Sequence, residues 1–136
     1  MKRTIVVVAA VIRRDDGAVL LARRRPGGPD GGRWEFPGGK LEPGEQDEAC
    51  LARELHEELG VTATIGALLA VGYGEYASFR IELRGYQARI LAGEPQPHDH
   101  DELAWVQAAD LRRYDLPAAD IPLMRALEEG ARQAEA

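Results

Sequence analysis

Three glutamates, Glu54, Glu57 and Glu58, have the spacing that first indicates chemistry in this chain. They lie within residues 47–59, where leucines recur every four residues and predict a helix. Residues three and four apart share one helix face, where like charges repel. A divalent cation would relieve that repulsion, and oxygen ligands with few histidines nearby suit Mg²⁺ or Mn²⁺ rather than zinc. The alternative is that these glutamates form a solvated helix face. The helix considered by itself favours that alternative, because glutamate is a good helix former.

The residues around the glutamates favour a site over a solvated face. Gly38 and Gly39 precede the helix, at a place where the backbone can approach a phosphate closely. Lys40 follows the glycine pair and can reach a phosphate as a point charge. Glu45 lies at the helix entry and can reach the same cluster, and Arg53 can hold a carboxylate in a bidentate pair. This context predicts phosphate binding through a bound cation.

The predicted helix over residues 47–59 has the pattern of an element packed on a core. Leu51, Leu55 and Leu59 form an apolar stripe along one face, and the glutamate face lies beside that stripe. Gly60 stands where a C-terminal cap is expected. The helix therefore ends at a defined point and presents its carboxylates at the edge of the core.

Apolar runs rich in β-branched residues predict the strands that position this helix. Residues 15–17 read Asp-Asp-Gly, a turn, so the first two strands can pair as a hairpin. Two segments rich in proline or glycine, residues 26–32 and 37–39, are predicted loops on either side of the short apolar segment 34–36. The predicted strands are residues 4–11, 18–22, 62–71, 80–91 and 103–106.

A second helix is predicted over residues 122–133, and residues 108–114 form a short helix or turn. Strands interleaved with two helices predict an α/β fold with a mixed sheet between helices, an α/β/α arrangement. A chain of 136 residues without repeats fits a single domain, residues 1–136.

Composition and charge exclude several classes of protein. The chain carries 17 Lys and Arg against 23 Asp and Glu, a formal charge of −6, which predicts no binding of a nucleic-acid polymer. The apolar run at residues 5–12 is too short to span a membrane and lacks a signal-peptide cleavage site, so we interpret it as a buried strand. A single cysteine, Cys50, allows no internal disulfide. We expect a cytoplasmic protein.

The segment of residues 39–61 resembles the Nudix box, G-x5-E-x7-R-E-U-x-E-E-x-G-U, in which U is an aliphatic residue. Residues 34–40 and 116–122 also resemble segments of MutT-like and CTP-pyrophosphohydrolase-like members of that family. One departure is Gln46, where relatives often carry Ser or Thr as the helix cap, and Asp47 is expected to cap in its place. Every fixed position of the box is matched, by Gly39, Glu45, Arg53, Glu54, Leu55, Glu57, Glu58, Gly60 and Val61.

The resemblance implies the Nudix fold, a mixed sheet sandwiched between helices, and hydrolysis of a nucleoside diphosphate linked to another group. By this resemblance Glu54, Glu57 and Glu58 would bind Mg²⁺ or Mn²⁺, and the Gly39 carbonyl would add a ligand. The metal would neutralise phosphate oxygens and lower the pKa of a bound water.

The general base has two candidate positions. Glu54 is the first choice, whereas some relatives use an acid on a later loop, where Asp99 matches best and Glu102 second. His98 and His100 flank Asp99 and can be interpreted as part of a zinc site or as members of a solvated acidic loop. The loop interpretation is favoured, because two histidines without a third strong ligand are weak grounds for zinc.

Asp120 is the most informative residue outside the box. In MutT-like relatives the corresponding position contacts the base edge. An ionised carboxylate only accepts hydrogen bonds, so it suits the amino group of cytosine or the N1–H and amino group of guanine and 8-oxoguanine. The alternative is that Asp120 caps the helix that begins near Pro122.

Aromatic and basic residues are the other candidates for substrate binding. Phe36 or Trp34 can stack on the base, with core packing as the alternative. Arg23, Arg24 and Arg25 form a basic run, of which one, with Arg23 as the first candidate, is expected to face phosphate or base.

These features predict a Mg²⁺-dependent nucleoside triphosphate pyrophosphohydrolase that releases the monophosphate and pyrophosphate. The predicted substrates are CTP, dCTP or modified cytosine nucleotides first and 8-oxo-dGTP second, and the family implies a role in cleansing the nucleotide pool. The alternatives are a hydrolase of ADP-ribose or of dinucleoside polyphosphates, the latter in view of Tyr73 and Tyr76, and a nucleotide-sensing module without turnover. Whether the protein is a monomer or a homodimer stays open.

Overall fold

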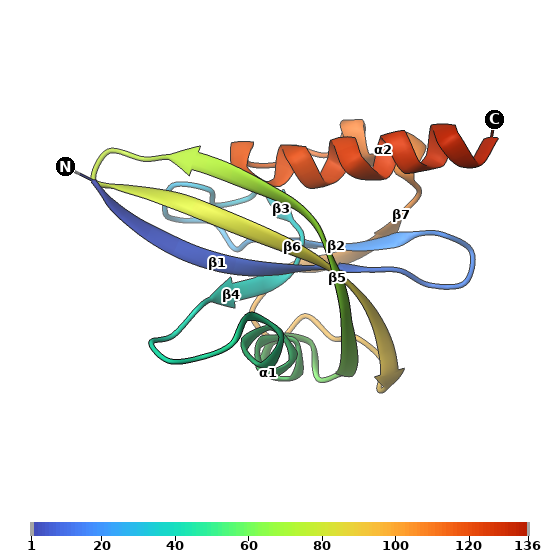
Figure 1. Cartoon of the computed structure of the whole chain (residues 1–136), viewed down its shortest axis with the longest axis horizontal. Helices are drawn as coiled ribbons and strands as arrows, with labels where there is room; N and C mark the ends of the chain where they lie inside the picture. The colour runs from blue at the N-terminus through green and yellow to red at the C-terminus, as the bar shows by residue number, and fades with distance from the viewer. Residues whose placement is uncertain (1, 136) are drawn as a thin grey trace.

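The computed structural model of the chain describes residues 2–135, so Met1 and Ala136, the ends of the predicted domain, lie outside the described residues. Two sheets and two long helices make up the fold (Figure 1). One sheet has the strand order β4-β1-β6-β5, and the other has the order β3-β2-β7. The strands are β1 (Arg3–Ile12), β2 (Val19–Arg23), β3 (Trp34–Glu35), β4 (Gly38–Lys40), β5 (Thr62–Glu75), β6 (Phe79–Ala92) and β7 (Glu102–Val106).

The central strand β1 explains the mixed character of the larger sheet. It runs parallel to β6, with Arg3 opposite Phe79, and antiparallel to β4. The second half of β1, residues 8–12, is buried on both faces. This burial agrees with its near-continuous apolar sequence. Val8 and Ile12 pack with the core on one side, and Ala9 and Val11 pack with the core on the other. This alternation places β1 between two helical layers.

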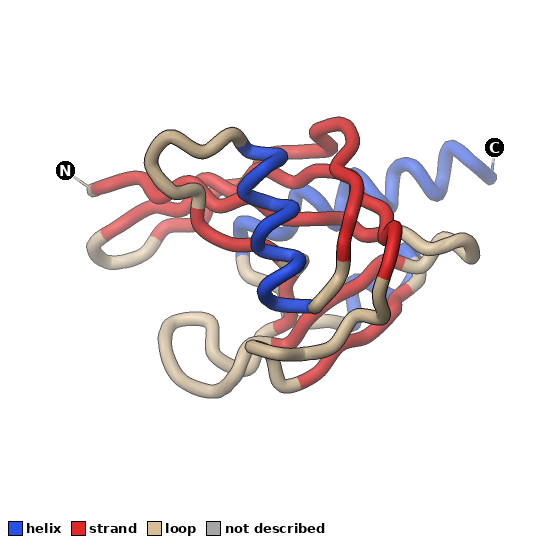
Figure 2. The backbone as a smooth tube through the Cα atoms, turned by 90° about the horizontal axis from the view of Figure 1, so that it is seen from below, coloured by secondary structure: helices blue, strands red, loops and turns tan. Residues whose placement is uncertain are grey.

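The helices cover opposite faces of the larger sheet, which confirms the predicted α/β arrangement. Helix α1 (Asp47–Leu59) packs Leu51, Leu55 and Leu59 against one face and ends at Gly60, whose φ of 72° is left-handed. Helix α2 (Ile121–Glu135) packs against the other face. Figure 2 shows α1 lying across the strands on the near side, with α2 beyond them. Short 3-10 helices, η1 (Ala108–Arg113) and η2 (Ala118–Asp120), precede α2.

The prediction that the first two strands pair as a hairpin is wrong. β1 and β2 belong to different sheets and share only one isolated bridge, between Arg13 and Val19. Each strand has two hydrogen-bonding edges: β4 and β6 occupy those of β1, while β3 and β7 occupy those of β2. The turn between them therefore carries the chain from one sheet to the other.

The prediction of a loop over residues 37–39 is wrong for Gly38 and Gly39, which belong to a strand. Residues Gly38–Lys40 form β4, which pairs with β1 so that Gly38 lies opposite Ala9. A Cβ atom on Gly38 would lie 1.9 Å from the carbonyl oxygen of Val8. Glycine therefore serves here for close approach of two backbones rather than for a turn.

The start of α1 differs from the predicted cap at Asp47. Gln46 occupies the N-cap position and makes no side-chain cap bond. The Asp47 carboxylate instead accepts hydrogen bonds from the Tyr86 hydroxyl at 2.5 Å and from the Arg84 guanidinium at 3.0 Å. Both partners belong to β6, so they tie the first turn of α1 to the central sheet.

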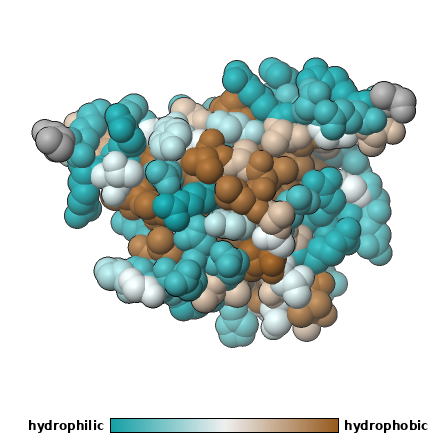
Figure 3. Space-filling model, in the orientation of Figure 1, coloured by the Kyte–Doolittle hydropathy of each residue, from teal (hydrophilic) through white to brown (hydrophobic). Residues whose placement is uncertain are grey.

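The outer edge of the larger sheet is β5, which is longer than the predicted strand and has irregular register against β6. It exposes two large hydrophobic side chains, Leu68 and Tyr73. Hydrophobic residues gather across the middle of one face of the molecule, below the hydrophilic surface of α2 (Figure 3). Among residues 2–135 no helix has the length and apolar character needed to cross a membrane.

Candidate active site

One cavity of about 890 Å³ joins the glutamate helix to an apolar surface of the sheet. Glu54, Glu58 and the Gly38–Lys40 strand line its carboxylate part. Its apolar part, which we call the floor, consists of Ile5, Val7, Ile81, Leu83 and the ring of Phe79. The floor side chains alternate along β1 and β6, which pair in parallel and so present one face together.

Arg53 organises the carboxylates of α1. Its Nε and Nη2 atoms bind the two carboxylate oxygens of Glu45 at 3.0 and 2.9 Å, the bidentate geometry expected from the sequence. Its Nη1 atom lies 3.1 Å from Glu54 and 3.2 Å from Glu57. The hydrogen bond from Arg53, with the backbone N–H of Glu42, lowers the pKa of Glu45 to about 2. Glu45 is therefore a permanent counter-charge for Arg53.

Glu54 lies against the backbone of β4. A Cβ atom on Gly39 would be 2.3 Å from the Glu54 carboxyl carbon, so only glycine fits under this carboxylate. The Glu54 side chain is 15% exposed, and burial raises its pKa, although the charge of Arg53 opposes that shift. The structure thus brings Gly39 and Glu54, two predicted metal ligands, into direct contact.

Glu58 has no hydrogen-bond partner for its buried Oε2 atom among the described residues. Burial raises the pKa of Glu58 to about 7, and the nearby charge of His100 opposes this effect. A buried carboxylate oxygen without a partner is costly and fits a place for a cation. Glu57 differs, because its side chain is 56% exposed and, within residues 2–135, forms an ion pair only with Arg53.

The described residues do not hold three predicted ligands close enough to form a ready metal centre. Arg53 bonds to Glu54 and Glu57 and draws both carboxylates toward its guanidinium. The donor set still fits a hard cation by its chemistry, since all its atoms are oxygens. The side chains of Glu57 and Glu58 would have to turn toward each other for both to reach one ion.

The histidines near Asp99 have separate partners and do not form a zinc site among the described residues. His98 places Nδ1 3.2 Å from the Glu57 carbonyl oxygen. His100 is buried and places Nε2 2.9 Å from the Glu35 carboxylate. Burial lowers the pKa of His100, but the hydrogen bond and charge of Glu35 outweigh it, so the net shift is upward.

Asp99, the predicted alternative base, lines the cavity together with His100. Glu102, the second candidate, lies outside the cavity lining and pairs with Arg23 at 3.4 Å. Arg23 also lies over the Trp34 ring, 5.8 Å from its centroid. The structure therefore places Asp99 at the site and leaves Glu102 and Arg23 outside it.

Arg24 and Arg25, rather than Arg23, line the cavity. Arg24 lies 3.1 Å from the Glu35 carboxylate, and Arg25 donates to the His98 carbonyl oxygen at 3.2 Å. The basic run alone could not separate the three arginines, because the choice depends on where β2 ends and the following loop begins. Sequence reasoning also missed two cavity residues that lack a local motif, Asp30 and Glu35, and it considered Tyr76 and His100 only in other roles.

Asp120 is 3% exposed, and its Oδ2 atom accepts a hydrogen bond from the backbone N–H of Phe36 at 3.0 Å. Burial raises the pKa of Asp120 to about 8, although the Phe36 hydrogen bond acts in the opposite direction. Phe36 lines the cavity, whereas Trp34 packs edge-on against Tyr114 with 5.1 Å between ring centroids. Asp120 itself lies outside the cavity lining, so contact between its carboxylate and a base stays a prediction.

Comparison with known proteins identifies the family to which this site belongs. The NUDIX domain model matches residues 3–127. The chain belongs to the NUDIX family. The helix that carries Arg53 and the three glutamates is thus the helix of the Nudix box, and Nudix hydrolases generally need a divalent metal ion.

Curated relatives of this Nudix hydrolase are named as nucleotide pyrophosphohydrolases. The CTP pyrophosphohydrolase of Escherichia coli (strain K12) is 42% identical over 95 residues, which cover 70% of each chain. The putative 8-oxo-dGTP diphosphatase 2 of Mycobacterium tuberculosis (strain H37Rv) is 47% identical over 93 residues, 65% of this chain and 64% of that protein. These names support nucleotide pyrophosphohydrolase activity of the Nudix type for the chain.

Solved structures agree with the fold of this Nudix hydrolase. The solution structure of the E. coli ORF135 protein has a TM-score of 0.80 and 40% identity, and covers 98% of this chain and 94% of that one. The MutT protein from Methanosarcina mazei Go1 has a TM-score of 0.82 at 26% identity, with 99% and 98% coverage. The predicted Nudix fold is confirmed.

Proposed function

We propose that this Nudix hydrolase cleaves nucleoside triphosphates to the monophosphate and pyrophosphate with Mg²⁺ or Mn²⁺. We propose CTP, dCTP or modified cytosine nucleotides as the first substrates and 8-oxo-dGTP as the second. The observation that carries this proposal is the cavity of about 890 Å³, which joins the carboxylates of α1 to an apolar floor. A nucleotide has the same division, with a polyphosphate that needs cations and a base that needs an apolar surface.

Glu54, Glu57, Glu58 and the backbone of Gly39 would hold the cation. The partnerless Oε2 of Glu58 and the contact between Glu54 and Gly39 support this assignment. When bound, Mg²⁺ neutralises phosphate oxygens and lowers the pKa of an attacking water. Arg53 positions Glu54 and Glu57 through its Nη1 atom.

The positions of the charged residues that line the cavity suggest further roles in proton transfer and phosphate binding. Glu54 takes the proton of the attacking water, with Asp99 as the alternative base, since both line the cavity. Lys40, Arg24 and Arg25 supply positive charge for the phosphates that the cation does not neutralise.

We call the apolar floor together with Asp30, Glu35 and Tyr76 the base part of the cavity. It offers the carboxylate of Glu35 as an acceptor, while Asp30 is bonded to Tyr76 and Asp120 lies outside the cavity lining. Amino groups of cytosine or 8-oxoguanine are matching donors, whereas the carbonyl edge of uracil would face carboxylates. The names of the E. coli and M. tuberculosis relatives support the same two base classes.

The test incubates the purified protein with Mg²⁺ and a nucleotide panel and separates the products by chromatography. The panel contains CTP, dCTP, 5-methyl-dCTP, dGTP, 8-oxo-dGTP, ADP-ribose and diadenosine tetraphosphate. Conversion of cytosine or 8-oxoguanine triphosphates to monophosphates and pyrophosphate is the expected result. Turnover confined to ADP-ribose or diadenosine tetraphosphate would discard the substrate proposal, and binding without any turnover would support a sensing module.

The acidic net charge supports the further proposal that the protein binds no nucleic-acid polymer, and a nucleotide is its proposed partner. We also propose a single domain over residues 1–136 and a cytoplasmic location.

A further inference from the structure

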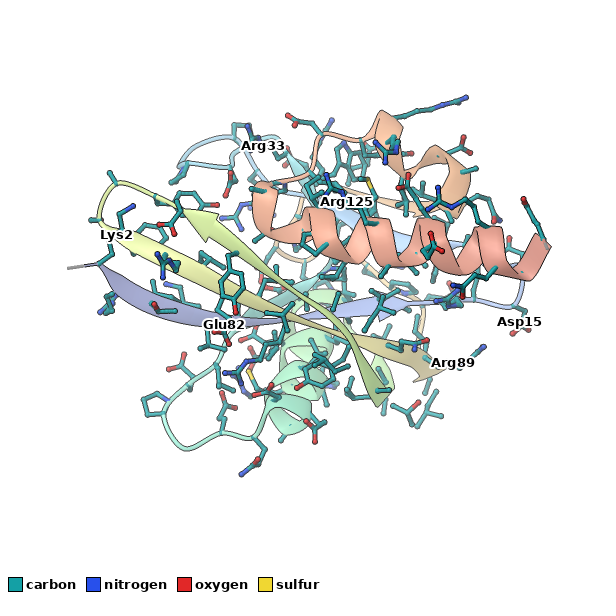
Figure 4. All side chains as sticks on the ribbon, turned by 45° about the horizontal axis from the view of Figure 1, so that its top comes forward. Lys2, Asp15, Arg33, Glu82, Arg89 and Arg125 are labelled. Carbon is teal, nitrogen blue, oxygen red and sulfur yellow. The ribbon has the colours of Figure 1, made fainter. Side chains whose placement is uncertain are left out.

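One hydrogen bond links two distant segments above the base part of the cavity. The Tyr76 hydroxyl, from the turn between β5 and β6, donates to Oδ2 of Asp30, which lies on the loop between β2 and β3. The two residues are 46 positions apart in the chain. The other carboxylate oxygen of Asp30 accepts a hydrogen bond from the Arg33 guanidinium at 3.5 Å. Arg33 lies on the same loop (Figure 4). Asp30 is thus bonded on both oxygens.

The middle of this loop, residues 26–32, has few other restraints, whereas Arg25 and Arg33 on either side of it contact His98 and Asp115. Within residues 26–32 the remaining hydrogen bonds join neighbours in the same β2–β3 connection, such as that of Gly31 N–H with the Gly28 carbonyl at 3.3 Å. Among residues 2–135 the bond to Tyr76 is the only hydrogen bond from residues 26–32 to another part of the fold. Gly27 and Gly28 have φ of 104° and 76°, left-handed values that glycine adopts more readily than other residues.

Tyr76 is itself held in place by the floor. Its ring stacks on Phe79 with 4.7 Å between centroids and an angle of 10°. Burial, and then the hydrogen bond to Asp30, raise the pKa of Tyr76 to about 12, so the hydroxyl stays a donor at neutral pH. Tyr76, Phe79 and Asp30 all line the cavity. The bond therefore joins the loop to the surface on which a base would lie.

We propose that Tyr76 and Asp30 form a latch that holds the β2–β3 loop over the base part of the cavity and so determines base affinity and discrimination. This inference rests on the proposed function, because it needs a nucleotide whose base occupies the floor. The latch makes no contact with the carboxylates of α1. Its loss therefore weakens the binding of the base while the phosphate chemistry continues.

Three substitutions separate the hydrogen bond from the packing of the ring. Tyr76→Phe keeps the stacked ring and removes the donor. Asp30→Ala removes the acceptor, whereas Asp30→Asn keeps an oxygen that can accept from Tyr76. Tyr73→Phe is the matched control, since Tyr73 is 57% exposed and lies outside the cavity lining.

The measurements are KM and kcat for dCTP and 8-oxo-dGTP, with inorganic triphosphate as a competitive inhibitor that has no base. Tyr76→Phe and Asp30→Ala should raise KM about tenfold and change kcat less than about twofold, since one partly buried hydrogen bond is lost. The difference between the two bases should shrink, while the inhibition constant of inorganic triphosphate stays constant. Asp30→Asn should recover most of the affinity, and Tyr73→Phe should match the wild type.

A double substitution tests whether the two residues act together. Tyr76→Phe with Asp30→Ala should raise KM no further than Asp30→Ala alone, because both remove the same bond. Trypsin should cleave after Arg33 faster in Tyr76→Phe than in the wild type, since the loop is released. Additive effects of the two substitutions, an unchanged KM in Tyr76→Phe, or an equal change in triphosphate inhibition would each overturn the latch.

Failure of the proposed function is distinguishable from failure of the latch. If the wild type hydrolyses only ADP-ribose or diadenosine tetraphosphate, the substrate proposal fails and the same variants are measured with that nucleotide. A raised KM in Tyr76→Phe with that nucleotide would then uphold the latch, and an unchanged KM would overturn it.

Discussion

At the scale of single residues, the three glutamates of the box differ because their surroundings differ. The Glu54 carboxylate packs against the backbone of Gly39. Glu57 is exposed and forms an ion pair with Arg53. Glu58 has a buried carboxylate oxygen that has no hydrogen-bond partner among the described residues. Equal spacing along a helix therefore conceals unequal chemistry. Of the three, Glu58 is the one whose charge most needs a cation.

Glu58→Gln should lower kcat about a hundredfold or more, because a metal ligand supplies several kcal/mol of transition-state stabilisation. Without metal the variant should unfold at the same or a higher temperature than the wild type, since it removes a buried charge. The rise in unfolding temperature on addition of Mg²⁺ should shrink.

Glu48→Gln is the control for this measurement, because Glu48 lies on the same helix and is exposed. It should leave both turnover and the Mg²⁺-dependent rise in unfolding temperature unchanged. Wild-type turnover in Glu58→Gln would contradict the ligand assignment.

At the scale of elements, the position of α1 depends on a tie at its first turn. The Asp47 carboxylate joins Tyr86 and Arg84 of β6, while Leu51, Leu55 and Leu59 supply the buried contact along the helix. The acid also lies at the positive end of the helix dipole, which favours a negative charge. The tie holds the register of α1 against the sheet.

Tyr86→Phe should lower the free energy of unfolding by about 1 kcal/mol, because it removes one donor to Asp47 and keeps the ring. For a chain of this size the midpoint of thermal unfolding should fall by about 3 °C. Differential scanning calorimetry measures the shift, with Tyr73→Phe as the exposed control. Since Tyr86 lies outside the cavity lining, kcat should stay within about twofold of the wild type. A stability equal to that of the wild type would show that Arg84 alone secures the helix.

At the scale of the whole molecule, strands of both sheets and helix α1 meet around the cavity, so a carboxyl group buried next to a cavity residue influences overall stability. Asp120 is such a group, and it belongs to η2 while its partner Phe36 directly follows β3. Its pKa of about 8 lies far above the ordinary value for an aspartate. The folded protein therefore holds this proton more tightly than the unfolded chain does.

The sign of the pH dependence follows from that difference. Because the pKa is raised on folding, the contribution of Asp120 to stability is complete below the unfolded pKa, near 4. It is lost as pH rises toward 8, at no more than about 1.4 kcal/mol per pH unit. The metal-free wild type should thus lose stability between pH 5 and pH 8.

Asp120→Asn should flatten this decline, because asparagine keeps an acceptor for the Phe36 N–H and does not titrate. Denaturant unfolding of the metal-free proteins at pH 5 and pH 8 measures the two slopes. An equally steep decline in the variant would assign the pH dependence to another group.

The local part of this protein was predictable from the chain alone. Helix α1 begins and ends at the predicted residues, and the box glutamates lie along it with the predicted spacing. Arg53 forms the predicted bidentate pair, and the structure shows that its partner is Glu45. These features depend on neighbours within a few residues, so periodicity and spacing are enough to specify them. The mixed α/β architecture followed from the same signals, and the family was indicated by the resemblance of residues 39–61 to the Nudix box.

Only the tertiary structure decided which distant segments meet. Strand pairing depends on which edges are already occupied, so β1 and β2 separated into two sheets and Gly38 became part of a strand. The same long-range pairing selected Arg24 over Arg23 for the cavity and bonded Asp120 to Phe36. It also brought Asp30 to Tyr76 across 46 residues, a contact without any local signal, because hydrogen-bond partners in space leave no mark in the spacing of the chain.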